Sequence, residues 1–173
     1  MRKHLLIVAT TLVVLGLFTI VACNKTTTKP ATPAPTACNG ALMCFKLDGT
    51  DMTYSTDVVW KKIAAVGTNP ERYRIYWENS GGSENIEIDV YATATGTYNI
   101  KNGNPYAVND AAFQLWQSSG MYLAGVSGTV EITNIDNTNN TISGKFTVAT
   151  EDKNNSNAAH QVTEGNFVNV PFK

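Results

Sequence analysis

The residue with the most specific chemistry in this 173-residue sequence is Cys23. It follows an apolar run over residues 5–22, and a short basic head of Arg2, Lys3 and His4 precedes that run. A basic head followed by an apolar stretch and a small residue is the layout of a secretory signal. We therefore expect residues 1–22 to be a signal peptide that exports the rest of the chain.

The end of the apolar run indicates what happens to the Cys23 thiol. Ile20-Val21-Ala22-Cys23 resembles a bacterial lipobox, which implies that the chain is cut before Cys23 and that the thiol is diacylated. Two or more acyl chains give stable membrane anchoring. The alternatives are a retained membrane helix, for which the run is just long enough, and a plain cleaved signal. A retained helix is more often followed by a cluster of Lys or Arg, whereas residues 24–28 contain one Lys.

The segment after Cys23 reads as a spacer. Residues 24–37 are dominated by Thr, Pro, Ala and Lys and show no apolar periodicity, so we expect residues 23–38 to be a lipidated Cys and a disordered, flexible linker. A recognition peptide is the alternative reading of such a composition. Loss of Arg2 and Lys3 leaves 11 basic against 14 acidic residues, a formal charge of −3, which indicates neither nucleic acid nor an anionic membrane surface as partner.

Two further cysteines, Cys38 and Cys44, frame five residues. In an oxidising envelope compartment a disulfide is the expected state of such a pair. Two free thiols, or half of a metal site, are the alternatives. The metal site is disfavoured because the chain has no second Cys pair and because His160 is the one histidine after the signal.

Side chains that suit catalysis are present but do not form a recognisable constellation. His160 follows the polar stretch 154–159, where we expect a solvated loop residue rather than the base of a hydrolytic triad. A glycosidase-like pair needs two converging carboxylates. The candidates lie on expected solvent faces or turns; they are Asp48, Asp51, Asp57, Glu78, Glu84, Glu87, Asp89 and Glu131. The sequence therefore predicts no catalytic residue.

The oxygen-rich stretch 136–140 is the one candidate for a cation site. An EF-hand register requires Asp or Asn at its third position, Gly at its sixth and Glu at its twelfth. Thr138, Thr141 and Thr147 stand at those positions. We therefore expect a hairpin turn rich in Asn and Asp there, and neither a metal nor another cofactor in the protein.

Aromatic residues offer the remaining candidate for binding. Exposed aromatic rings suit a sugar-stacking platform or an apolar pocket, although most such rings pack in cores or against neighbouring strands. Strand alternation places Tyr76 on the face opposite Ile75 and Trp77, and Trp116 follows a less regular pattern. These two residues are the predicted ligand-binding side chains.

The elements that position these residues are β-strands. In residues 86–90, Ile86, Ile88 and Val90 alternate with two acidic residues, so one face is core and the other is solvated. Residues 72–78 repeat the pattern, and the turn 79–82 predicts a hairpin between the two strands. Residues 57–66 suit a short helix or a strand, and their β-branched side chains favour the strand.

Residues 39–173 are therefore predicted to form one all-β domain of nine or ten antiparallel strands. A β-sandwich is the preferred architecture, and an up-and-down β-barrel is the alternative.

Several motifs, taken in order, resemble a family of small Bacteroidota-type envelope lipoproteins of unknown function. They are Gly96-Thr97-Tyr98-Asn99-Ile100, residues 127–133 (SGTVEIT), residues 140–146 (NTISGKF) and residues 162–167 (VTEGNF), with Val170-Pro171-Phe172 at the end. The resemblance implies a lipid-anchored all-β domain and carries over no catalytic residue. It also implies surface display when acidic residues follow the lipidated Cys, and residues 24–27 contain none. We therefore expect an outer-membrane anchor that faces the periplasm.

Taken together, the sequence predicts a non-enzymatic, lipid-anchored envelope protein. Its β domain is expected to bind a glycan, a peptide or an apolar small molecule through exposed aromatic side chains. The alternative is a structural or accessory subunit of an envelope complex, which would present a flat apolar patch or an open sheet edge to a partner protein. A hydrolase, with converging carboxylates of perturbed pKa, is the third hypothesis.

Overall fold

The computed structural model describes residues 38–103 and 106–173; the predicted signal peptide, Cys23 and most of the linker lie outside them. The described part of the chain contains ten strands and no helix, which confirms the all-β class. No helix in these ranges is long and apolar enough to span a bilayer. The strands are β1 (Met43–Leu47), β2 (Thr50–Tyr54), β3 (Val59–Ile63), β4 (Arg72–Glu78), β5 (Asn85–Val90), β6 (Gly96–Ile100), β7 (Asp110–Trp116), β8 (Tyr122–Asp136), β9 (Thr141–Asp152) and β10 (Ala158–Pro171).

All ten strands belong to one sheet with the order β2-β1-β10-β9-β8-β6-β7-β5-β4-β3, and β8 also pairs with β7. One pairing departs from the expected antiparallel pattern, because β6 and β7 run parallel. The reason lies in the long strand β8, which pairs antiparallel with β6 at residues 129–132 and with β7 at residues 122–124. Two strands that are both antiparallel to a third must be parallel to each other.

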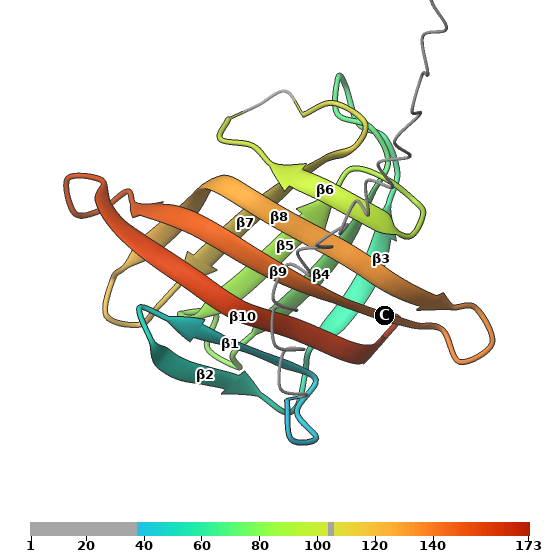
Figure 1. Ribbon diagram of the computed structural model, residues 1–173, viewed down its shortest axis with the longest axis horizontal. Coiled ribbons are helices and arrows are strands. Elements are labelled where there is room, and N and C mark those ends of the chain that lie inside the picture. Colours follow the sequence, from blue (N-terminus) through green and yellow to red (C-terminus); the bar gives the residue numbers. More distant parts are fainter. Residues whose placement is uncertain (1–37, 104–105) are drawn as a thin grey trace, which may run out of the picture. The chain divides into compact units, whose positions relative to one another are not determined.

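The sheet curls so strongly that its two halves enclose one core, much as the two layers of a sandwich do. Figure 1 shows β8, β9 and β10 crossing in front of β4, β5 and β7. Across the core, the rings of Phe113 on β7 and Phe146 on β9 lie 6.0 Å apart. The two ends of the sheet also approach each other, since the Tyr54 ring of β2 lies 4.5 Å from the Trp77 ring of β4.

The alternation seen in the sequence sets which side chains fill this core. Ile86, Ile88 and Val90 are fully buried, and so is Ile75 on the neighbouring strand β4. The ambiguous stretch 57–66 contains strand β3, whose Trp60 is buried. The strand interpretation of this stretch is therefore correct, and its aromatic residue belongs to the core.

The long strands β8, β9 and β10 bend through irregularities in their pairing. Register shifts occur between Val162 and Gly165 and between Phe167 and Val170, and an extra residue of this kind increases local twist. Gly144 permits close packing on β9, because a Cβ there would lie 2.2 Å from the carbonyl oxygen of Glu131.

One expectation about this region is wrong, and one strand is long because its pairing tolerates an irregularity. A register shift between Gly125 and Ser127 lies within β8, which runs unbroken over 15 residues. His160 was expected in a solvated loop, yet it pairs with Thr150 inside β10. The Asn-rich turn is shorter than expected, because left-handed backbone at Ser156 and Asn157 completes it and the strand resumes at Ala158.

Candidate functional site

The two predicted ligand-binding residues, Tyr76 and Trp116, lie on the same outward face of the sheet. Tyr76 on β4 is paired with Glu87 on β5, which is paired with Gln114 on β7. Trp116 stands two residues beyond Gln114 and is paired with Tyr122 on β8. Residues paired directly across strands share a face, as do residues two apart on one strand. We call the surface formed by Tyr76, Glu87, Gln114, Trp116 and Tyr122 the aromatic face.

The spacing of the aromatic face follows from the sheet. Two strand spacings and two residues along a strand separate Tyr76 from Trp116, which places their Cα atoms about 12 Å apart. Glu87 and Gln114 lie between them. The face thus combines two separated rings with carboxylate and amide groups on the outward side of the sheet.

The ring of Trp116 is held in place yet remains accessible. It stacks on Tyr122 with a centroid separation of 4.0 Å and an interplanar angle of 12°, and Trp116 is 38% exposed. At the other end of the face, the Tyr76 ring is approached by two ammonium groups. The Nζ atom of Lys61 lies 4.6 Å from the ring centroid and that of Lys173 lies 5.9 Å from it, within the range of cation–π attraction.

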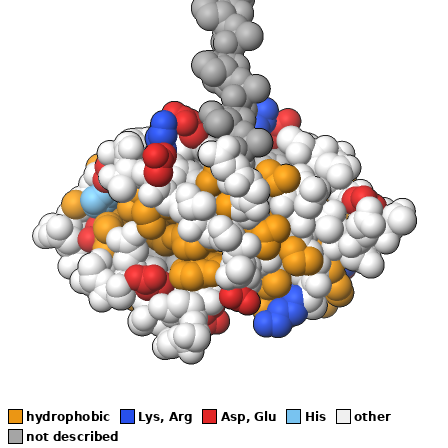
Figure 2. All heavy atoms as spheres, turned by 90° about the horizontal axis from the view of Figure 1, so that it is seen from below, with side chains coloured by type: hydrophobic (Ala, Val, Ile, Leu, Met, Phe, Trp, Pro, Cys, Tyr) orange, Lys and Arg blue, Asp and Glu red, His pale blue; other side chains and the backbone are white. Residues whose placement is uncertain are grey.

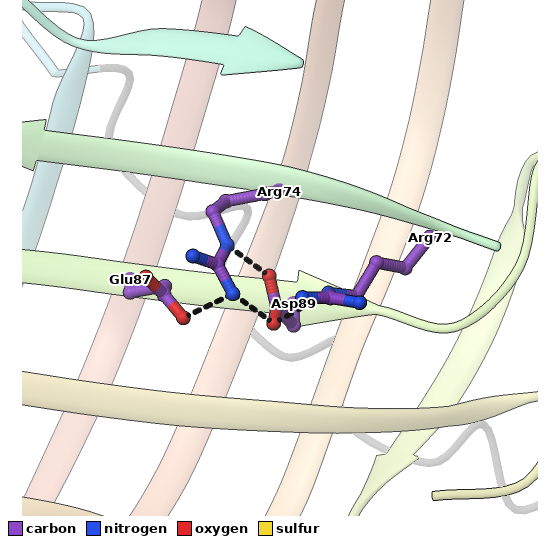
Figure 3. Close-up of polar contacts among 4 residues, drawn as sticks. All are labelled: Arg72, Arg74, Glu87 and Asp89. Atoms are coloured by element: carbon purple, nitrogen blue, oxygen red, sulfur yellow. Dashed lines mark hydrogen bonds and ion pairs between the residues drawn. The ribbon is translucent and has the colours of Figure 1, made fainter. Parts of the chain in front are cut away.

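Next to the aromatic face, four charged side chains from β4 and β5 form an ion-pair network (Figure 3). Arg72 Nε donates to Asp89 Oδ2 at 2.9 Å, while Arg74 donates from Nε to Oδ1 and from Nη2 to Oδ2, both at 2.7 Å. Arg74 Nη2 also lies 2.7 Å from Glu87 Oε1. Arg74 therefore links the buried Asp89 to Glu87 on the aromatic face.

The burial of this network differs from the sequence prediction, which placed Glu87 and Asp89 on a solvent face. The outward direction is correct, but the Asp89 side chain is only 5% exposed. The arginine side chains cover it, and the Arg72 guanidinium lies 5.5 Å from the Tyr91 ring, which stacks on Tyr106 at 4.5 Å. Burial therefore comes from neighbouring side chains on the outer face.

The electrostatics of the network separate the roles of its two acids. Both Asp89 oxygens accept hydrogen bonds from arginine, so this carboxylate positions Arg72 and Arg74. Burial and, next, the charge of Asp89 raise the pKa of Glu87, while Arg74, Arg72 and Lys61 oppose the increase. Glu87, which is 27% exposed, is the acid in the network that a ligand can reach more readily.

The alternating charges could have revealed this network from the sequence. Arg72 and Arg74 alternate on one strand of the predicted hairpin, and Glu87 and Asp89 alternate on the other. Once the turn at residues 79–84 is closed, Arg74 falls opposite Asp89. Nothing in the sequence signals the stacking of Tyr122 on Trp116, because it depends on β7 pairing with β8.

The predicted disulfide is present, and it lies apart from the aromatic face. Cys38 and Cys44 are joined by a disulfide with an S–S distance of 2.06 Å. Beside it lies an open hollow of about 430 Å³ that includes Lys46, Asp51 and Glu164 in its lining. A 2.9 Å ion pair between Lys46 and Glu164 spans part of this lining. No residue of the aromatic face lines the hollow, so the two features are separate.

The remaining candidates have structural roles. Asp136 Oδ1 accepts hydrogen bonds from the backbone N–H groups of Thr138 and Asn139, which makes the stretch 136–140 a hairpin turn, as predicted. His160 Nδ1 lies 2.6 Å from Asp48 Oδ2 and so links β10 to the β1–β2 turn. Within residues 38–103 and 106–173, no three His, Cys, Asp or Glu side chains are grouped to hold a metal ion.

Comparison of the sequence with protein-family models identifies the family of this chain. A family model described as "Domain of unknown function (DUF6252)" matches residues 56–171, about two thirds of the chain. The chain belongs to this family. The match includes β3 to β10 and thus the whole aromatic face, whereas β1, β2 and the disulfide precede it. Searches of curated proteins and of solved structures find no significant match.

Proposed function

We propose that this DUF6252 protein is a lipid-anchored envelope protein whose β domain is a non-catalytic glycan-binding module. The proposal rests on one observation: Tyr76 and Trp116, which are distant in the sequence, lie on one outward face with polar groups between them. Ring faces pack against the apolar faces of sugars, and the flanking amide and carboxylate suit hydroxyl groups. An open face accommodates an extended polysaccharide lying across the strands.

The position of the face within the sheet favours a glycan over a peptide. Peptides that bind sheets commonly add a strand to an exposed edge, where their main chain finds unpaired partners. The aromatic face lies on β4, β5, β7 and β8, and each of these strands is paired on both sides. A ligand there is contacted through side chains alone, as a sugar can be.

The face is also organised before a ligand arrives. Stacking on Tyr122 restricts the Trp116 ring, and the ion pair with Arg74 orients Glu87. A site that is ordered in advance loses less conformational entropy on binding.

The anchor is the second part of the proposal. The lipobox at residues 20–23 supports acylation of Cys23 and retention in the outer membrane, with the domain facing the periplasm. Replacing Cys23 with Ala should release a folded domain into the soluble periplasmic fraction. A Cys23→Ala protein that remains in the membrane fraction would contradict the lipid anchor without affecting the glycan proposal.

The glycan site is tested by affinity electrophoresis of the wild-type domain against a panel of neutral and acidic polysaccharides. Trp116→Ala and Tyr76→Ala should each weaken binding about fivefold, since an aromatic contact contributes roughly 1 kcal/mol. Val66→Ala is the control, because Val66 is 66% exposed and lies outside the aromatic face. Wild-type affinity in both aromatic variants would refute the site.

A specific observation favours a second candidate, an accessory subunit of an envelope complex. β2 lies at one end of the sheet and, in the described part of the chain, is paired with β1 alone. In Figure 2, which views the molecule from below Figure 1, a band of hydrophobic side chains crosses the surface, on the side where β2 lies in Figure 1. A photo-crosslinker at the exposed Thr53 should then capture one envelope protein, whereas the same group at Trp116 should not. The opposite pattern would exclude the β2 edge as the interface.

A further inference from the structure

The end of the aromatic face around Tyr76 carries positive charge that the fold does not neutralise. Lys61 on β3 is paired directly with Arg74 on β4, so two cations stand opposite each other across strands. Like charges in that position are destabilising. Lys173 brings a third cation to the same ring.

The acidic groups nearby do not balance this concentration of charge. Asp89 is bound by both arginines, and Glu87 is paired with Arg74. Among the described residues, Lys61, Lys101 and Lys173 form no ion pair, whereas Lys46, Lys62, Lys145 and Lys153 each pair with a glutamate. Of the three, Lys61 and Lys173 stand at the same ring, that of Tyr76. Two ammonium groups at one ring therefore remain without a direct ion pair to an acidic side chain, although acidic residues outnumber basic ones in the sequence.

A local arrangement that costs stability without a compensating contact points to a functional site. Here the missing contact is an anion, because an acidic group above Tyr76 would face Lys61 and Lys173 at once. We propose that the ligand of the aromatic face is an acidic polysaccharide, with a carboxylate or sulfate group at the Tyr76 end and a sugar ring on Trp116. This inference rests on the proposed glycan-binding function and adds the charge of the ligand to it.

The test compares ligands that differ only in charge. Polygalacturonate and its methyl ester share one sugar ring, and dextran sulfate and dextran share another. Wild-type protein should bind at least one acidic member roughly three- to tenfold more tightly than its neutral counterpart, the effect of two exposed ion pairs. The pair that shows the difference distinguishes carboxylate from sulfate, and the difference should shrink as salt is added.

Variants assign the effect to this end of the face. Lys61→Gln combined with Lys173→Gln should reduce the ratio of the affinities for the acidic ligand and its neutral counterpart to about one. Lys145→Gln is the matched control, since Lys145 lies on β9 and its side chain is 47% exposed. Circular dichroism of each variant confirms that it is folded.

Each remaining outcome has a defined meaning. Equal, Trp116-dependent binding of acidic and neutral ligands would overturn the inference and leave the glycan-binding proposal intact. Binding that does not depend on Trp116 would overturn both. Binding to phosphatidylglycerol vesicles in place of the acidic polysaccharides would show that the cations recognise a membrane surface, which also overturns the inference.

Discussion

Replacing Asp89 with Asn tests whether the network next to the aromatic face behaves as a buried set of charges. The Asp89 carboxylate is 5% exposed and accepts three hydrogen bonds from Arg72 and Arg74. Asn has nearly the same shape, but it carries no charge and directs an N–H₂ group toward one of the donors. Arg72 then loses its acidic partner, and Arg74 keeps only Glu87.

The expected loss follows from the exposure of the two arginines. Removing one partner of a buried ion pair typically costs about 3–5 kcal/mol, because the other charge stays buried without compensation. The side chains of Arg72 and Arg74 retain 15% and 22% exposure, and Glu87 still pairs with Arg74. We therefore expect the lower end, about 3 kcal/mol, which for a domain of this size lowers the Tm by about 10 °C.

Urea unfolding at neutral pH measures the change in the free energy of unfolding. Glu131→Gln is the control, because it breaks the Lys145–Glu131 pair, whose side chains are 47% and 36% exposed, and should cost under about 1 kcal/mol. If Asp89→Asn destabilises the domain no more than Glu131→Gln does, the burial argument is wrong. An unchanged slope against urea would show that the two variants unfold from equally compact states.

Three further predictions address other parts of the domain. Replacing Cys38 and Cys44 with Ser should lower the free energy of unfolding by roughly 2 kcal/mol, since the two residues close a short loop; equal urea midpoints for the variant and the oxidised wild type would contradict this. Burial raises the pKa of Glu87 in the folded protein above its ordinary value. Protonated Glu87 therefore favours the folded over the unfolded state, and this contribution is lost as pH rises through the raised pKa. Glu87→Gln should therefore gain stability relative to wild type above about pH 4, and parallel profiles of stability against pH would show that Glu87 titrates normally. Gly144→Ala should destabilise on the order of 3 kcal/mol, because its Cβ would lie 2.3 Å from the Phe167 ring; Gly81→Ala, with nothing within 4 Å of its Cβ, should be nearly neutral, and similar thermal midpoints for the two would contradict the close packing.

The alternation of apolar and polar residues was sufficient to predict the strands around the site and the outward direction of Tyr76, one of its two aromatic residues. Ile86, Ile88 and Val90 alternate with Glu87 and Asp89, and that period alone sets which face of β5 enters the core. The same reasoning placed Tyr76 outward, opposite its buried neighbour Ile75. These inferences hold because side-chain direction in a strand depends on the residues within that strand.

The alternation pattern could not predict how far β8 and β10 extend, because that depends on pairing with β9. His160 was expected in a loop because its neighbours are polar, yet pairing with β9 extends β10 through it. Strand β8 passes through Gly125 and Gly128, and its pairing with β9 continues across them through a register shift. In both places, hydrogen bonds to a distant strand outweigh local propensity.

The sequence by itself determined the β class, the Cys38–Cys44 pair and the outward direction of Tyr76; the secretory layout stays a prediction, because its residues lie outside the described ranges. Each of these depends on residues that are close together along the chain. Only the tertiary structure decided that Trp116 shares a face with Tyr76, that Asp89 is buried by its neighbours, and that Lys61 stands opposite Arg74. These arrangements depend on which strands become neighbours, and strand order is set by the packing of the whole core.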